Sequence, residues 1–119
     1  MKLNRFVTLI FGPVLILTGI AGFLTPPQAS LTSGAAPYNI FHIIFGIIGL
    51  LMVFARKPHY FNFGFGLIDI YQAIASYRNL PPKQFFLWTG VDDILHVVLG
   101  VGLALIGLYG ILKQKEEVR

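Results

Sequence analysis

The sequence predicts an all-α membrane protein, a four-transmembrane-helix bundle built from two tandem helical hairpins with both termini cytoplasmic. Of its 119 residues, 55% are hydrophobic and only 12% are charged, a composition far from that of soluble domains. The apolar residues gather in four runs, each near the roughly 17 to 25 residues that a membrane-crossing helix needs. None of the runs alternates polar and apolar residues as barrel strands do. Helices, rather than strands, are therefore expected to cross the bilayer.

The first run extends from Phe6 to Leu24 and follows the basic residues Lys2 and Arg5. Such a start also resembles a signal peptide, but the run is longer than the usual apolar region of one. We therefore interpret it as the first transmembrane helix. Pro13 removes one backbone donor and is expected to kink this helix.

The remaining runs are Tyr38 to Phe54, Tyr60 to Tyr77 and Val91 to Leu112, and each predicts one further helix. Basic residues near the ends of the runs indicate orientation, because cytoplasmic loops are enriched in Lys and Arg. Two basic residues, Arg78 and Lys83, fall on one side of the predicted membrane. Those on the other side are Lys2, Arg5, Arg56, Lys57, Lys113, Lys115 and Arg119. This bias predicts cytoplasmic N- and C-termini.

Composition also excludes several classes of function. The chain has no Cys, so disulfides, thiolate metal sites and a cysteine nucleophile are excluded. The net charge of +4 comes from residues at helix ends, which suits lipid headgroups rather than nucleic acid. No motif resembles a nucleophile elbow, a phosphate loop or a zinc-protease site. We therefore expect no enzymatic activity. The expected location is a bacterial inner membrane or a photosynthetic membrane.

A shift of 54 residues superposes the chain on itself and predicts an internal repeat, about 1–54 and 55–112. The shift places His42 on His96, and Phe11 with Gly12 on Phe65 with Gly66; it also pairs Gly46 with Gly100, Asn39 with Asp93 and Thr18 with Gln72. Because each half crosses the membrane twice, the two copies have the same orientation. The two histidines should then lie at one depth, near the outer face.

The segments "YNIFHIIFG" and "DDILHVVLG" carry the same polar pattern at the start of two predicted helices. Asn and Asp are preferred N-caps, so Asn39, Asp92 and Asp93 are candidate helix caps. Residues three apart share a helix face. In the alternative interpretation, Asn39 therefore orients His42, and Asp93 orients His96. Both interpretations stay open from the sequence.

In the second interpretation, His42 and His96 ligate a haem, a metal ion or chlorophyll, with carboxylate or amide groups supporting the ring nitrogens. Gly46 and Gly100, four residues after each histidine, would let a flat macrocycle approach the backbone. The same glycines are also explained by close helix packing without any ligand.

Asp69 lies midway along the third predicted helix, where a charge costs about 3 kcal/mol on insertion scales. Asp69, Gln72 and Ser76 are spaced by three and four residues, which places them on one helix face. Together with Thr18 of the first helix, they predict a polar pocket that opens toward the outer face. Its role is either a hydrogen bond between helices or the handling of a proton or small solute. His59 is expected to be a solvated loop residue.

The chain resembles a bacterial family of small four-helix membrane proteins described as a domain of unknown function. The resemblance depends on an Asn-x-x-His-x-x-x-Gly signature that opens the second and fourth helices, and on "GIAGF" at the end of the first. The matching residues are Asn39, His42 and Gly46, then Asp93, His96 and Gly100 with Asp replacing Asn. It implies a four-helix fold and brings no activity with it.

The sequence thus favours a non-enzymatic accessory or structural subunit of a larger membrane complex. Its partners are the lipid bilayer and other membrane proteins or further copies of the chain, with no nucleic acid. The alternatives are a cofactor-binding module that uses His42 and His96, and a proton- or solute-handling protein centred on Asp69.

Overall fold

In the computed structural model, residues 2–118 are described, with side chains for residues 2–114, and helices are their main element. The long helices are α1 (Lys2–Leu24), α2 (Ala36–Phe54), α3 (Pro58–Arg78) and α5 (Gly90–Val118), and two short ones, η1 (Pro27–Ala29) and α4 (Lys83–Phe86), interrupt the loops. Each predicted apolar run lies within one long helix. The all-helical fold is therefore confirmed for the described residues.

Three helices are long and apolar enough to cross a membrane: Lys2–Leu24, Ala36–Phe54 and Gly90–Gln114. α3 has 21 residues but is less apolar, because it carries polar side chains such as Asn62, Asp69 and Gln72. The described part of the chain thus confirms three candidate spans. The fourth span and the cytoplasmic termini remain predictions.

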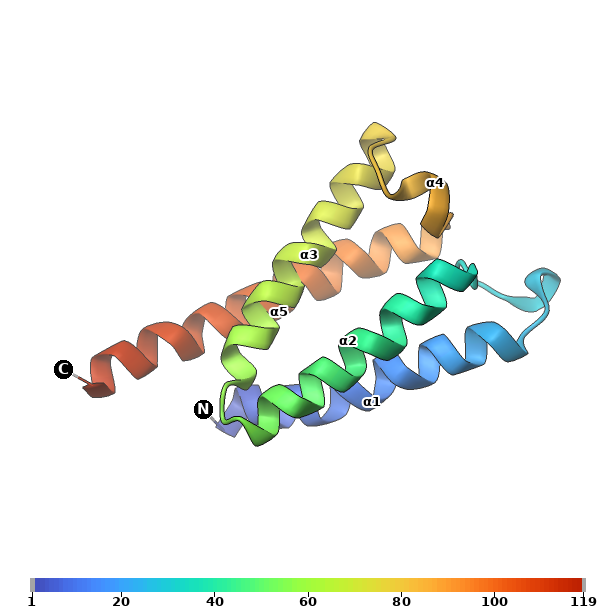
Figure 1. The fold of residues 1–119 in the computed structure, drawn as a ribbon. Helices are drawn as coiled ribbons and strands as arrows, with labels where there is room; N and C mark the ends of the chain where they lie inside the picture. Colours follow the sequence, from blue (N-terminus) through green and yellow to red (C-terminus); the bar gives the residue numbers. More distant parts are fainter. Residues whose placement is uncertain (1, 119) are drawn as a thin grey trace.

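The long helices pair as two hairpins, α1 with α2 and α3 with α5 (Figure 1). A connection of only three residues, 55–57, joins α2 to α3, and Arg56 adopts the left-handed conformation there (φ 61°). The N-terminus lies close to this connection, whereas the loop with η1 and the loop with α4 lie at the far ends of their hairpins (Figure 1).

The two hairpins are held by similar glycine contacts at positions 54 residues apart. A Cβ built on Gly46 would lie 2.5 Å from the Gly12 carbonyl oxygen, and one on Gly100 would lie 3.0 Å from the Gly66 carbonyl oxygen. Small residues at such positions let helix backbones approach closely, which is how membrane helices gain packing energy. The two glycines named in the sequence thus lie at helix–helix contacts.

Five of the six buried positions of α2 recur in α5 at the same offset of 54 residues, Asn39 being the exception. The buried pairs are Tyr38 and Asp92, His42 and His96, Gly46 and Gly100, Gly49 and Leu103, and Val53 and Gly107. α2 and α5 therefore turn matching faces toward the interior of the bundle.

Asn39 is not an N-cap, which corrects one prediction. α2 begins at Ala36 with Ala35 as its N-cap and Pro37 in its first turn. Proline favours this position because its missing N–H group would be unpaired there anyway. Asn39 therefore lies one turn inside the helix, where its Nδ2 donates to the Gly34 carbonyl oxygen at 2.8 Å.

α5 is capped by Thr89 and Asp92, which confirms the predicted cap Asp92. Asp93 is not a cap, which corrects a second prediction. The Thr89 backbone N–H donates to Asp92 Oδ2 at 2.9 Å, and the Asp92 N–H donates to Thr89 Oγ1 at 3.2 Å. This reciprocal pair is a capping box. Asp93 lies in the first turn, with its Oδ1 buried and without a partner among the described residues.

The prediction that His59 is a solvated loop residue is wrong. His59 is fully buried in the first turn of α3, because Pro58 begins that helix one residue earlier. Its Nε2 lies 2.8 Å from Gln114 Oε1 on α5.

Candidate functional site

A cavity of about 210 Å³ lies between the four long helices. Its polar lining comes from Thr18 on α1, Thr32 in the loop before α2, Tyr38 and His42 on α2, Asp69 on α3, and Asp92 and His96 on α5. Phe11, Phe65 and Leu99 are among the apolar side chains around it. The cavity thus joins both hairpins at one polar site.

The predicted site residues divide into those that line this cavity and those that do not. Thr18, His42, Asp69, Asp92 and His96 line it together. The others do not line it: Asn39, Gly46, Gln72, Ser76, Asp93 and Gly100. The predicted polar stripe of α3 therefore reaches the cavity at Asp69 alone.

His42 is oriented by the backbone of its own helix. Its Nδ1 lies 2.7 Å from the Tyr38 carbonyl oxygen, one turn earlier. A carbonyl oxygen can only accept, so Nδ1 carries the proton and Nε2 of the neutral ring keeps a lone pair. The exposed fraction of His42 is 8%. The imidazole is therefore held as a hydrogen-bond acceptor at the cavity wall.

Tyr38 and Asp92 form the link between α2 and α5, and sequence reasoning assigned Tyr38 no role. The Tyr38 hydroxyl donates to Asp92 Oδ1 at 2.6 Å, and Asp92 Oδ2 accepts from the Ser33 N–H at 2.8 Å. A signal was available, because Tyr38 and Asp92 are also 54 residues apart. Asp92 is satisfied by these donors and is a structural member of the site.

Asp69 is one of the lining groups whose hydrogen-bonding capacity is left open. Its exposed fraction is 4%, and none of the described side chains donates a hydrogen bond to its carboxyl group. A buried carboxyl without partners costs several kcal/mol relative to water. Thr18, which lines the cavity as well, uses its hydroxyl proton on the Val14 carbonyl oxygen at 2.8 Å.

His96 faces Trp88, the single tryptophan of the chain. The two rings meet edge to face with centroids 5.5 Å apart. His96 Nδ1 is buried and has no hydrogen-bond partner in the described part of the structure. The indole is thus placed where its fluorescence can report on the cavity wall.

The site does not suit the cofactors considered from the sequence. Within the described residues, no three His, Cys, Asp or Glu side chains come together as a metal site. The cavity is also smaller than the roughly 300 to 1,000 Å³ of pockets for drug-sized ligands. Gly46 and Gly100 leave no room for a macrocycle, because Ile16 and Ile70 cover them at 2.6 Å and 3.0 Å from an ideal Cβ. Haem and chlorophyll therefore do not fit the cavity.

A second polar cluster, between α1 and α3, was not predicted. Asn4, Thr8 and Asn62 are almost fully buried, and Thr8 Oγ1 lies 2.8 Å from Asn62 Oδ1 while Asn62 Nδ2 donates to Asn4 Oδ1 at 2.9 Å. Asn4 Nδ2 in turn donates to the Ile106 carbonyl oxygen of α5 at 3.1 Å. Its groups satisfy one another, so the cluster ties helices together.

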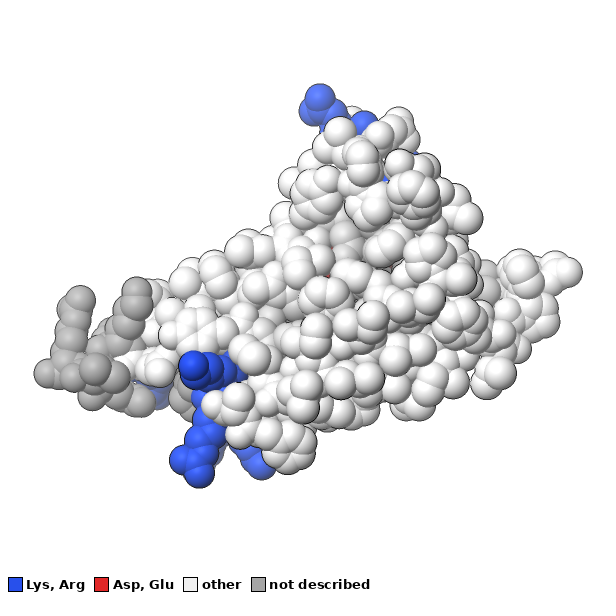
Figure 2. Space-filling model, viewed as in Figure 1, with Lys and Arg blue, Asp and Glu red and all other residues white. Residues whose placement is uncertain are grey.

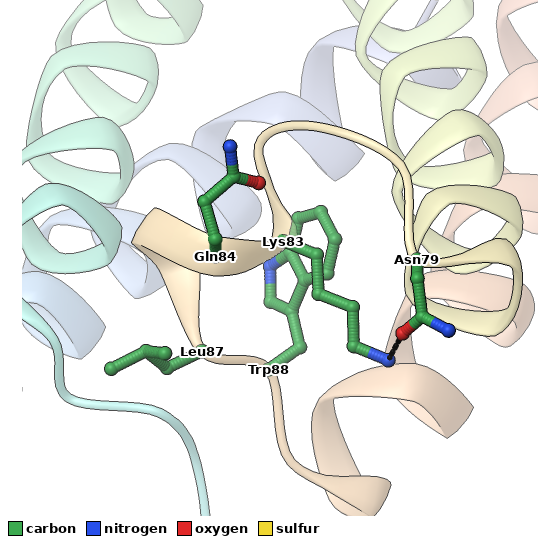
Figure 3. A pocket seen from close by; sticks show the side chains of 5 residues that line it. All are labelled: Asn79, Lys83, Gln84, Leu87 and Trp88. Carbon is green, nitrogen blue, oxygen red and sulfur yellow. Dashed lines mark hydrogen bonds between the residues drawn. The ribbon is translucent and has the colours of Figure 1, made fainter.

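A larger hollow of about 460 Å³ lies beside α4, lined by Asn79, Lys83, Gln84, Leu87 and Trp88 (Figure 3). Its one charged side chain, Lys83, donates to Asn79 Oδ1 at 3.0 Å and also to the Ser76 carbonyl oxygen. These bonds occupy the ammonium group, although Trp88 Nε1, also of this hollow, is buried without a partner among the described residues. The central cavity is the stronger candidate site.

No protein-family model, curated protein or solved structure matches this chain. The resemblance to a four-helix membrane family therefore stays a prediction, and function is argued from the site.

Proposed function

We propose that the protein crosses the membrane with four helices and binds a small hydrogen-bond-donating molecule in its central cavity. α3 is the proposed fourth span. Its 21 residues, at about 1.5 Å each, extend about 31 Å, close to the hydrocarbon thickness of a bilayer. Its polar side chains Asn62, Asp69 and Gln72 are buried, whereas Leu67 and Ile74 are exposed. This distribution suits a helix with lipid on its outer face.

We further propose that the N-terminus and the α2–α3 connection face the cytoplasm. Lys2, Arg5 and Arg56 line one groove there, and Figure 2 shows basic side chains at this end of the molecule. Arg78 and Lys83 mark the opposite end of α3. The orientation rule places the more basic end inside. Lys115 and Arg119, which also entered the prediction, lie outside the described side chains.

The cavity favours a ligand that donates hydrogen bonds, and this observation carries the proposal. The Tyr38 hydroxyl gives its proton to Asp92, the Thr18 hydroxyl to Val14 and His42 Nδ1 to Tyr38. These three groups therefore present lone pairs to a ligand, and Asp69 adds an open carboxyl. Thr32 and His96, which also line the cavity, can both donate and accept. Buried acceptors without donors are costly, so a donating ligand is stabilised there.

Size and walls define the ligand further. An apolar cavity of about 150 Å³ is known to hold a benzene molecule, so about 210 Å³ holds one substituted ring. Phe11, Tyr38 and Phe65 supply aromatic walls, which favour stacked or edge-to-face rings. A ring with a hydroxyl group meets both requirements. The proposed role is binding, with Asp69 and His42 as the accepting groups.

Phenol and anisole test this proposal, because anisole keeps the ring and lacks the donor. Trp88 emission should report phenol binding to the purified protein, with anisole bound about tenfold more weakly, the value of one hydrogen bond. A His42→Phe variant should reduce this preference, because Asp69 is then the one remaining acceptor of the two. Equal binding of phenol and anisole to the natural chain would refute the proposal.

A second proposal is a role as accessory or structural subunit, favoured by an open glycine on α3. A Cβ on Gly64 would meet nothing within 4 Å, and the exposed side chains Tyr60, Leu67 and Tyr71 lie on the same helix. Such a surface lets a partner helix approach closely. Purification in mild detergent should give an assembly larger than one chain, and Gly64→Leu should reduce it. A free monomer for both chains would contradict this role.

A further inference from the structure

A second, apolar groove of about 270 Å³ lies on the seam between the two hairpins, where α1 meets α5. Phe6 and Ile10 line it from α1, and Val98, Gly102 and Ile106 line it from α5. Phe6, Ile10 and Val98 are largely exposed, so the groove opens toward the lipid. It is an apolar surface without a helix of this chain covering it.

Phe11 and Leu99 line both this groove and the central cavity. The polar cavity and the apolar groove are therefore neighbours that share two side chains as their common wall. From Leu99 the groove continues along α5 to Ile106, about 10 Å at 1.5 Å per residue. A molecule that fills both spaces would pass between Phe11 and Leu99.

We propose that the ligand is a lipid-soluble phenol or hydroquinone, with its hydroxylated ring in the central cavity and its apolar tail in the groove between α1 and α5. This inference rests on the proposed function and adds the tail, the route of entry and the class of ligand. Entry is lateral, from the bilayer, through the seam between the hairpins.

The contact with the polar cavity, through the shared side chains Phe11 and Leu99, favours a ligand tail over a partner helix as the occupant. A helix with its side chains is about 10 Å wide and would stay outside a groove of this volume. A phospholipid chain fills the groove equally well but places no donor near Asp69 or His42. An amphipathic ring compound uses both spaces and satisfies the open acceptors.

The tail gains little transfer free energy, because lipid chains are as apolar as the groove. The tail contributes by positioning the ring at the seam between the hairpins and by keeping lipid out of the groove. The test must therefore compare variants of the protein with the same ligand, so that partition into the bilayer is identical on both sides of the comparison.

Gly102 and Gly64 give a matched pair for this test. Both lie in helices, and a Cβ on either one meets nothing within 4 Å, so each should accept a leucine. Gly102 lines the groove and Gly64 does not. Gly102→Leu therefore fills the groove, while Gly64→Leu makes the same change on a different surface.

The experiment measures phenol and 4-hexylphenol binding by Trp88 emission in lipid nanodiscs. Gly102→Leu should weaken hexylphenol binding about tenfold, because the leucine side chain occupies the space of the hexyl tail. A tenfold loss lies within the usual cost of forcing extra methylene groups into a filled space. Gly102→Leu should leave phenol binding unchanged. Gly64→Leu should leave both unchanged in nanodiscs that hold a single chain, where no partner helix covers Gly64. Val98→Phe narrows the same groove from an exposed position and should repeat the result if Gly102→Leu does not fold.

The outcomes separate the two proposals. If phenol binds and hexylphenol binding is the same in all variants, the groove does not hold the tail and this inference is overturned. An equal loss of phenol and hexylphenol in Gly102→Leu overturns it too. If neither compound binds the natural chain, the proposed function itself fails, and this inference with it.

Discussion

Gly64 and Gly66 should respond oppositely to the same substitution, although they are two residues apart on α3. A Cβ on Gly66 would lie 2.4 Å from the Ala104 backbone nitrogen, whereas ordinary contact begins at 3.4 Å. α3 and α5 must therefore separate locally by about 1 Å. Overpacking costs up to about 3 kcal/mol, and the better helix propensity of alanine offsets about 1 kcal/mol. Gly66→Ala should thus destabilise the protein by about 2 kcal/mol.

Gly64→Ala is the matched control, because its Cβ meets nothing within 4 Å. It should be neutral or stabilising by up to about 1 kcal/mol. Denaturant unfolding in mixed micelles, followed by Trp88 emission, measures both free energies of unfolding. If Gly66→Ala is as stable as the natural chain, the close packing of α3 on α5 described above is wrong.

Two further predictions concern the polar contacts between the hairpins. Asp92→Asn should destabilise the protein by about 2 kcal/mol, because an amide group cannot accept from both the Tyr38 hydroxyl and the Thr89 N–H. The control is Asp93→Asn in the same turn, which should lower the free energy of unfolding less. Thr8→Val and Asn62→Leu should show a coupling near 0.6 kcal/mol in a double-mutant cycle, the average for such bonds in membranes. Zero coupling would show that the hydrogen bond between Thr8 and Asn62 does not stabilise the protein.

The sequence predicted the helices and a polar pocket of Asp69, Gln72, Ser76 and Thr18, of which Asp69 and Thr18 line the cavity together with His42 and His96. Helical spacing identified the shared face of α3, and positions 54 residues apart make similar contacts in the two hairpins. The same offset pairs Tyr38 with Asp92 and Thr8 with Asn62, two contacts that were present in the pattern but not recognised.

What the sequence could not supply was the neighbour that each face meets. Ser76 shares the face of Asp69 but lies seven residues, about 10 Å, further along α3, where its carbonyl oxygen accepts from Lys83. Helix starts were misplaced for a similar reason. Pro37, Pro58 and Thr89 set the first turns, so Asn39 and His59 fall inside helices and not before them.

Thermal unfolding of Asp69→Leu, with and without phenol, tests the central claim most directly. Asp69 has no donor among the described side chains, and Leu15, buried and 54 residues earlier, occupies the corresponding place in the first hairpin. Removing an unsatisfied buried carboxyl should stabilise the protein by about 1 to 3 kcal/mol. Phenol should raise the unfolding temperature of the natural chain and raise that of Asp69→Leu less. A less stable variant that responds to phenol as strongly as the natural chain would show that Asp69 holds the helices together and does not bind a ligand.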